Sequence, residues 1–225
     1  MLEPKAESRV VCTDGEVQEV RPIFWVGIDD SISDFVKYNK PLQAISERYQ
    51  LYMVCSGGIS NKVRKWYHNP IVLECQNSRP MKGRVLFESI KKHGGYDVLI
   101  RTCPDALIFN CNMLFDIVRR YMQPHSVMGN LSRNKGRTWI RGACSVTSRS
   151  VVDAIEMKWN KGEKSFDQPF FRAAMEVGAT AIDKKLFEIG DEYTGTVPVW
   201  HPRQLKRLHL RFKRFYDQVK SNAKA

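Results

Sequence analysis

Asp105 is the residue whose position best suits chemistry on a charged ligand. It follows the apolar run at residues 98–103, which is typical of a buried strand. Ligands of an open α/β sheet bind at the carboxyl ends of its strands, where Asp105 would meet a metal ion or a phosphate-bearing substrate. The alternative is that Asp105 only completes a turn after Pro104, because Pro and Asp both favour turns.

The elements that must position Asp105 alternate between strands and helices. Apolar runs rich in β-formers predict strands at 23–28, 51–55, 71–74, 98–103, 126–129 and 139–146. Helical spacing of apolar residues predicts helices at 33–49, 84–93, 113–121, 148–159 and 167–175. Ser148 is the expected N-cap of the fourth helix, and Asp167 or Gln168 the expected cap of the fifth. Repeated β-α order predicts a three-layer α/β fold, with a mainly parallel sheet flanked by helices.

Length and composition fit one folded domain with appendages. The 225 residues suffice for one substantial core, and 43% of them are apolar. No apolar run approaches the roughly 20 residues of a membrane span, so we expect no transmembrane segment. Residues 1–19 show neither the basic start nor the apolar centre of a secretory signal. We expect a polar extension at 1–20, one main domain at 21–202 and a basic helix at 203–225.

The six cysteines predict reduced thiols. They form no C-x-x-C pair and have no His partner at zinc-finger spacing, which argues against a structural zinc site. Several lie inside apolar runs, where a free thiol behaves as a small core residue of a protein in a reducing compartment. We therefore expect a cytoplasmic protein without a disulfide framework.

The positive charge is concentrated at one end of the chain. Eight Lys or Arg and one Asp lie between Arg203 and Ala225, so this segment carries seven of the twelve net positive charges. Its apolar residues recur every three or four positions, which predicts a basic amphipathic helix. Such a helix can bind an anionic membrane surface peripherally, bind a nucleic-acid backbone, or serve only solubility.

Five segments, in order, resemble the nucleotide-sugar glycosyltransferases of the GT-A fold, over roughly residues 20–205. They are KGR at 82–84, YDVLIRTCPD at 96–105, RGACSVTSR at 141–149, FDQPFF at 166–171 and the late His201-Pro202. The resemblance implies a GT-A-like (Rossmann-like) domain. It also implies transfer of a hexose or pentose from a nucleoside-diphosphate sugar, such as a UDP-sugar, to a hydroxyl group.

The resemblance also implies a metal site. In that family the strand corresponding to 98–103 ends in Asp-x-Asp, whose carboxylates hold a divalent cation on the donor diphosphate. This chain has Cys103-Pro104-Asp105 there, which leaves Asp105 as metal ligand, with His201 as a second ligand for Mn²⁺ or Mg²⁺. Diphosphate oxygens and water can complete the shell, so we expect weak metal dependence or none. The alternative for His201 is an ordinary loop histidine.

Sugar transfer needs positive charge at the leaving diphosphate and a base for the acceptor hydroxyl. Donor binding is expected from Lys82, Arg84, Arg101 and Asp105. Lys82 and Arg84 have the alternative of a solvated helix end, whereas Arg101 lies within a strand, where a charge normally needs a partner. By the resemblance, Asp167 stands in the place of the base of an inverting enzyme, and its alternative is the helix cap.

The acceptor is expected to be anionic. A glycan or lipid-linked glycan at a membrane would use the basic tail, and so would hydroxylated bases in phage or viral DNA. A non-catalytic nucleic-acid-binding protein would also explain the charge, but no zinc-finger, RRM or KH motif is present. Another nucleotide-dependent α/β enzyme is a further alternative. This chain has neither the G-x-G-x-x-G motif nor the Walker loop, and Gly57-Gly58 alone is a weak signal. The sequence favours a glycosyltransferase.

Overall fold

The computed structural model describes residues 9–11, 17–27, 39–55, 57–68, 70–75, 79–134, 136–158, 166–190 and 193–202. The basic helix expected at 203–225 lies outside the described residues. Of the expected N-terminal extension, the structure describes two short strands, β1 (Arg9–Val11) and β2 (Val17–Glu19), which pair antiparallel.

A seven-stranded sheet with the order β10-β8-β9-β6-β3-β4-β5 forms the centre of the molecule. Its strands are β3 (Pro22–Gly27), β4 (Gln50–Cys55), β5 (Ile71–Glu74), β6 (Val98–Thr102), β8 (Ser126–Asn134), β9 (Arg137–Ser148) and β10 (Thr180–Asp183). β9 pairs antiparallel with both of its neighbours, β6 and β8, and the other pairs of this sheet are parallel. The expected mainly parallel sheet is therefore confirmed, with one long strand reversed inside it.

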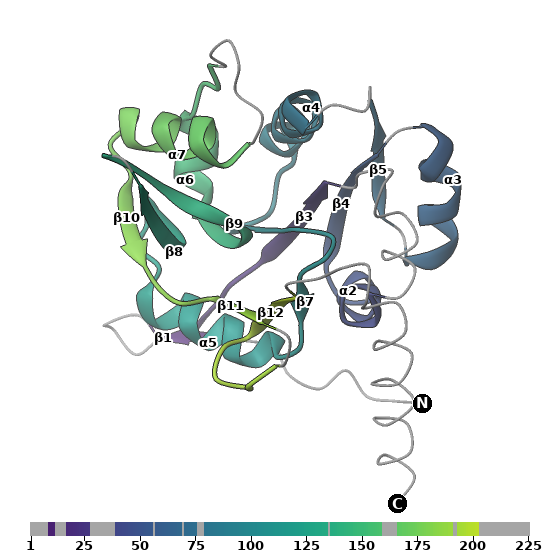
Figure 1. Cartoon of the computed structure of the whole chain (residues 1–225), viewed down its shortest axis with the longest axis horizontal. Helices are drawn as coiled ribbons and strands as arrows, with labels where there is room; N and C mark the ends of the chain where they lie inside the picture. The colour runs from purple at the N-terminus through teal and green to yellow at the C-terminus, as the bar shows by residue number, and fades with distance from the viewer. Residues whose placement is uncertain are drawn as a thin grey trace, which may run out of the picture.

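Helices cover both faces of this sheet, so the predicted three layers are confirmed (Figure 1). One face carries α2 (Lys40–Ser46), α3 (Gly57–Trp66) and α5 (Cys111–Tyr121). The other face carries α4 (Arg79–Lys92), α6 (Arg149–Ala154) and α7 (Asp167–Glu176). None of the described helices is long and apolar enough to cross a membrane.

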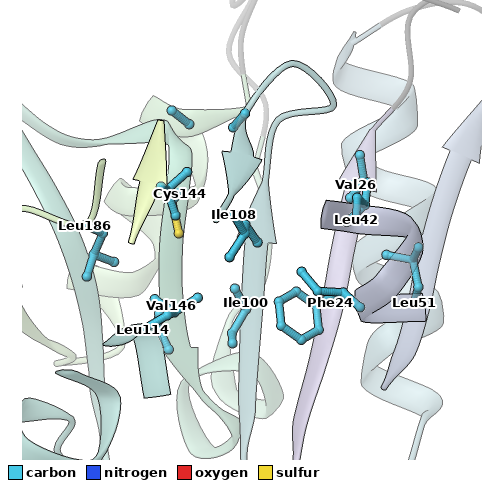
Figure 2. Packing of buried hydrophobic residues seen from close by; sticks show 14 of the residues in the cluster. Phe24, Val26, Leu42, Leu51, Ile100, Ile108, Leu114, Cys144, Val146 and Leu186 are labelled. Carbon is cyan, nitrogen blue, oxygen red and sulfur yellow. The ribbon is translucent and has the colours of Figure 1, made fainter. Parts of the chain in front are cut away.

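The core consists of two apolar clusters, one on each side of the sheet. Phe24 and Ile100, on the neighbouring strands β3 and β6, face the first cluster together with Leu42 of α2 (Figure 2). Ile23 and Trp25 point to the opposite cluster, because successive side chains of a strand alternate between the two faces. Central parallel strands are buried on both faces, which explains the continuous apolar runs of the sequence.

A second, three-stranded sheet brings the end of the described chain back to its middle. β7 (Leu107–Ile108) follows directly on the turn that carries Asp105, and β12 (Val199–Pro202) pairs with it antiparallel. β11 (Phe187–Gly190) completes the order β11-β12-β7. This pairing determines where His201 lies.

Several predicted helix boundaries are wrong. α2 ends at Ser46 rather than Tyr49, and α4 begins at Arg79 instead of Arg84. α3 was not predicted, because Gly57-Gly58 at its start is more typical of a loop. α6 ends at Ala154. The Ser148 hydroxyl makes no cap hydrogen bond to this helix and instead accepts one from the Ser126 backbone N–H at 3.0 Å.

Asn39 connects α2 to the turn that carries Asp105. Its Oδ1 accepts a hydrogen bond from the Leu42 backbone N–H at 3.1 Å, which caps α2. Its Nδ2 donates to the carbonyl oxygens of Pro104, at 3.0 Å, and Ala106, at 3.1 Å. The side chain is completely buried, so all three bonds form away from water. Asn39 therefore fixes the backbone on both sides of Asp105.

We expect Asn39→Asp to lower the free energy of unfolding by about 2 kcal/mol or more, measured by urea denaturation. The aspartate keeps the oxygen that caps α2 but removes both donors and places a buried carboxylate oxygen against two carbonyls. Asn110→Asp is the matched control, because Asn110 caps α5 through its Oδ1 alone and is exposed. A change below about 0.5 kcal/mol is expected for the control. Equal effects of the two variants would contradict this account of Asn39.

Candidate functional site

Asp105 and His201 lie in contact at the carboxyl end of β6. Asp105 lies in the turn between β6 and β7, which the Ala106 backbone N–H closes by donating to the Cys103 carbonyl at 3.1 Å. His201 comes from β12, and its Nε2 lies 3.3 Å from Asp105 Oδ2. The structure thus brings the two expected metal ligands together from positions far apart in the sequence.

The separation of these two atoms is that of an ion pair, and it is also compatible with two ligands of one divalent cation. Two atoms bound at right angles to one metal, each at roughly 2.1 Å, lie about 3 Å apart, close to the separation seen here. Both side chains are partly accessible, with exposed fractions of 15% for Asp105 and 25% for His201. Among the described residues, no group of three or more His, Cys, Asp or Glu side chains gathers around a common point. Further ligands would therefore have to come from a substrate or from water.

A second charged pair, between Arg101 and Asp167, lies on the opposite side of the sheet from the first core cluster. Arg101 is 8% exposed on β6, and its Nη2 donates to Asp167 Oδ1. Its guanidinium lies 5.0 Å from the ring centroid of Phe166 and 5.8 Å from that of Trp25. Trp25 is the register partner of Arg101 on β3, so both side chains leave the same face of the sheet. The charge in the strand thus has both an anionic partner and aromatic neighbours.

Asp167 does not cap α7. Phe166 occupies the N-cap position, no side chain makes a cap hydrogen bond, and Asp167 is the first helical residue. Its carboxylate binds Arg101 instead, so the cap expected from the sequence is wrong. Asp167 keeps a favourable place for a negative charge, since the amino end of a helix carries partial positive charge.

Gly142 leaves the space that the Arg101–Asp167 pair occupies. A Cβ at this position would lie 2.2 Å from Arg101 Nη2 and 2.5 and 2.7 Å from the two oxygens of Asp167. Real Cβ atoms essentially never come so close to another heavy atom. Any residue other than glycine would therefore require the Arg101 and Asp167 side chains to shift.

Cys103 connects the two pairs. Its Sγ donates to the Gly142 carbonyl at 3.1 Å, and its backbone N–H donates to the Ala143 carbonyl at 3.3 Å. Burial raises the pKa of the Cys103 thiol well above its usual range. The nearby carboxylates of Asp105 and Asp167 raise this pKa as well, and Arg101 lowers it. Cys103 is thus a neutral thiol close to both pairs, and it is one of five free cysteines among the described residues.

Lys82 and Arg84 lie on α4, on either side of Gly83. A Cβ on Gly83, between them, would come within 2.2 Å of the Phe166 ring, so this turn of α4 packs against the residue that precedes Asp167. The Arg84 guanidinium is exposed and binds Glu88 at 2.8 Å, one turn along the helix. The Lys82 side chain lies outside the described residues.

Sequence reasoning did not identify Trp25, Phe166, Gly142 and Asn39 as parts of the site. The charge of Arg101 indirectly indicates neighbours such as Trp25 and Phe166, because a charge in a buried strand needs side chains that can accommodate it. Asn39 has a signal of its own, as an Asn two residues before Pro41 is a typical helix start. Gly142 lies within the segment at 141–149 that carries the resemblance, but its role depends on what lies beside it in the fold.

Comparison of the sequence with known protein families and with curated proteins finds no match. Solved structures do match. The mannosyltransferase PcManGT from Pyrobaculum calidifontis, in complex with GDP-Man and Mn²⁺, is 13% identical and has a TM-score of 0.51. The match covers 73% of this chain and 55% of the mannosyltransferase, so the chain spans little more than half of that protein's length.

The galactosyltransferase LgtC, in complex with donor and acceptor sugar analogs, is 8% identical and has a TM-score of 0.50. Here the match covers 81% of this chain and 87% of LgtC. At these identities the likeness concerns the fold, which agrees with the resemblance found in the sequence. The chain has the GT-A fold of nucleotide-sugar glycosyltransferases.

Proposed function

We propose that this chain is a glycosyltransferase that moves a sugar from a nucleoside-diphosphate sugar to an acceptor hydroxyl. The contact between Asp105 and His201 at the carboxyl end of β6 carries the proposal. Two proteins of similar fold support it, because one was solved with GDP-Man and Mn²⁺ and the other with donor and acceptor sugar analogs. The donor diphosphate would lie at this end of the sheet.

Asp105 and His201 are the proposed ligands of Mn²⁺ or Mg²⁺. When bound, such a cation supplies positive charge to the leaving diphosphate. With two protein ligands, the remaining positions fall to diphosphate oxygens and water, which makes metal binding depend on the donor. Lys82 and Arg84 are proposed as further contacts to the diphosphate, since their turn of α4 packs at Gly83 against Phe166, the residue before Asp167.

Asp167 is the proposed base of an inverting transfer. The acceptor oxygen would form a bond to the anomeric carbon while its proton passes to Asp167. The bond from that carbon to the diphosphate breaks, and its electron pair leaves with the diphosphate. Arg101 holds Oδ1 of the carboxylate, which leaves Oδ2 for the acceptor proton. Arg101 is therefore a positioning residue for Asp167 in this proposal, rather than the donor contact expected from the sequence.

Asp105→Asn is expected to weaken donor binding by about tenfold or more and to abolish its dependence on Mn²⁺. Calorimetric titration of the full chain with UDP, GDP and their sugar conjugates, with and without Mn²⁺, measures both effects. Asp116→Asn removes an exposed carboxylate of α5 and should leave binding unchanged. The proposal is wrong if the folded wild-type protein binds none of these nucleotides, or if Asp105→Asn binds them equally well.

Asp167→Asn should lower turnover by about 10²- to 10⁴-fold with little change in donor affinity, because it removes a proton acceptor and keeps the shape of the side chain. Release of nucleoside diphosphate from the donor, with water as acceptor, gives the rate. Asp153→Asn, an exposed carboxylate on α6, is the control. Loss of donor affinity in Asp167→Asn would instead assign this residue to donor binding, and retained turnover would exclude it as the base.

Gly142→Ala should disturb the site without removing any polar group. The new methyl group must displace Arg101 or Asp167, so we expect turnover to fall at least about tenfold and the free energy of unfolding to fall by about 1–3 kcal/mol. An added Cβ on Gly94 meets no atom within 4 Å, so Gly94→Ala is the matched control and should change neither quantity. Equal behaviour of the two variants would argue against the close approach of β9 to the pair.

A further inference from the structure

Strands β8 and β9 continue together beyond the sheet edge that carries Asp105. β6 pairs with β9 only as far as Thr102↔Cys144, whereas β8 and β9 pair on from Leu131↔Ile140 to Asn134↔Arg137. We call residues 131–134 and 136–141 the β8–β9 ribbon. Its base is Gly142, which lies against Arg101 and Asp167. The ribbon therefore projects directly from the proposed catalytic site.

The ribbon is basic and carries no acid. The sequence from Asn130 to Gly142 contains three Arg and one Lys, and neither Asp nor Glu. Arg133, Arg137 and Arg141 are exposed. In the part of the chain that the structure describes, no carboxylate lies within ion-pair distance of these three guanidinium groups. Asp183 of β10 contacts the ribbon through its Oδ1, which accepts a hydrogen bond from the Leu131 backbone N–H at 3.1 Å.

One face of the ribbon combines an aromatic ring with charge and hydrogen-bonding groups. Trp139 pairs with Ser132 and Arg137 pairs with Asn134, and residues directly opposite one another in an antiparallel pair share a face. Alternation along β9 puts Trp139 and Arg137 on that same face. Trp139 is partly exposed and packs against the second core cluster, which holds its ring in place.

These features fit a single-stranded nucleic acid better than a membrane surface. Proteins bind single strands by stacking bases on aromatic rings and by following the phosphates with Arg or Lys. Arginine suits this role, because its planar group both binds phosphate and stacks. A membrane-surface element needs large apolar side chains facing the lipid. Among the described residues the exposed large hydrophobics are Tyr121 and Ile189, and neither lies on the ribbon.

We propose that the β8–β9 ribbon binds a single-stranded nucleic acid and presents it to Asp167 as the acceptor of the sugar. This proposal rests on the proposed function and names its acceptor class. Arg141 lies next to Gly142, and Arg137 lies four residues further, about 13 Å along an extended strand. A single-stranded nucleic acid on this surface would thus have its phosphates bound by Arg137 and Arg141, away from the reacting hydroxyl. One of its nucleotides would reach the site.

Fluorescence anisotropy of a labelled single-stranded oligonucleotide of about 20 nucleotides, titrated with the full chain at several salt concentrations, tests the proposal. Arg137→Ala/Arg141→Ala should weaken binding at least about tenfold and lower the slope of log K against log salt by about 1.4, as expected for two lost phosphate contacts. Lys62→Ala/Lys65→Ala removes two exposed charges from α3 and is the matched control. The basic residues after Arg203 are the same in all variants, so they contribute equally.

Trp139→Ala should weaken binding by about tenfold with an unchanged salt slope, because stacking releases no counterions. Trp139→Phe, which keeps a ring and its packing, should retain most of the affinity and guards against loss of fold. Equal losses in the ribbon and α3 variants, or no effect of Trp139→Ala, would overturn the proposal. The proposal would also be overturned, in favour of a membrane surface, if the ribbon substitutions abolished binding to phosphatidylglycerol vesicles and left oligonucleotide binding unaffected.

Titration of the ribbon variants with the nucleotide sugar separates this inference from the proposed function. The variants should bind the donor like the wild type, since neither substituted arginine lies among the proposed donor contacts. Donor binding with no ribbon-dependent oligonucleotide binding would overturn the acceptor class alone. Ribbon-dependent oligonucleotide binding by a wild-type protein that binds no donor would refute the transferase and, with it, the role of the strand as acceptor.

Discussion

The burial of one guanidinium group determines how this part of the molecule is built. Arg101 leaves a central strand toward the core, where an unpaired charge would be costly. Its compensation needs Asp167 from α7, Trp25 from β3 and Phe166 from the residue before α7, together with the empty space at Gly142 on β9. Residues of β3, β9 and the start of α7, which are distant in the sequence, thus meet around one side chain of β6. The same arrangement that satisfies the charge also orients the carboxylate proposed as the base.

The reversal of β9 is the second constraint. If β9 ran parallel to β6, its carboxyl end would lie at the same sheet edge as the carboxyl end of β6. The chain would then turn away from the site at that edge. Because β9 runs antiparallel, the segment before Cys144 crosses the carboxyl end of β6, where the carbonyls of Gly142 and Ala143 accept hydrogen bonds from Cys103. Before that point the strand continues as the ribbon with β8. One long antiparallel strand therefore supplies both a wall of the site and the surface that leads away from it.

The sequence predicts the sheet far better than the site. Strand 71–74 matches β5 and strand 98–103 nearly matches β6, because continuous apolar β-formers are a direct consequence of burial on both faces. The need of Arg101 for a partner is visible in the sequence, but its identity is not, since Asp167 lies 66 positions away and reaches it only through tertiary packing. In the sequence alone, the position of Asp167 fits a helix cap as well as it fits a catalytic base. Pairing of β12 with β7 likewise determines the position of His201, and strand register across such a separation leaves no local pattern.

The same packing gives a physical reason for the missing first carboxylate of the Asp-x-Asp motif. Position 103 faces the carbonyl oxygen of Gly142, which requires a donor. A thiol can donate, and burial together with two neighbouring carboxylates raises the pKa of Cys103, so it keeps its proton. An ionised aspartate there would face a carbonyl oxygen with no proton to give and would add a third negative charge near Asp105 and Asp167. The close approach of β9 thus favours a neutral donor at position 103, and the proposed cation site is left with Asp105 and His201 as its protein ligands.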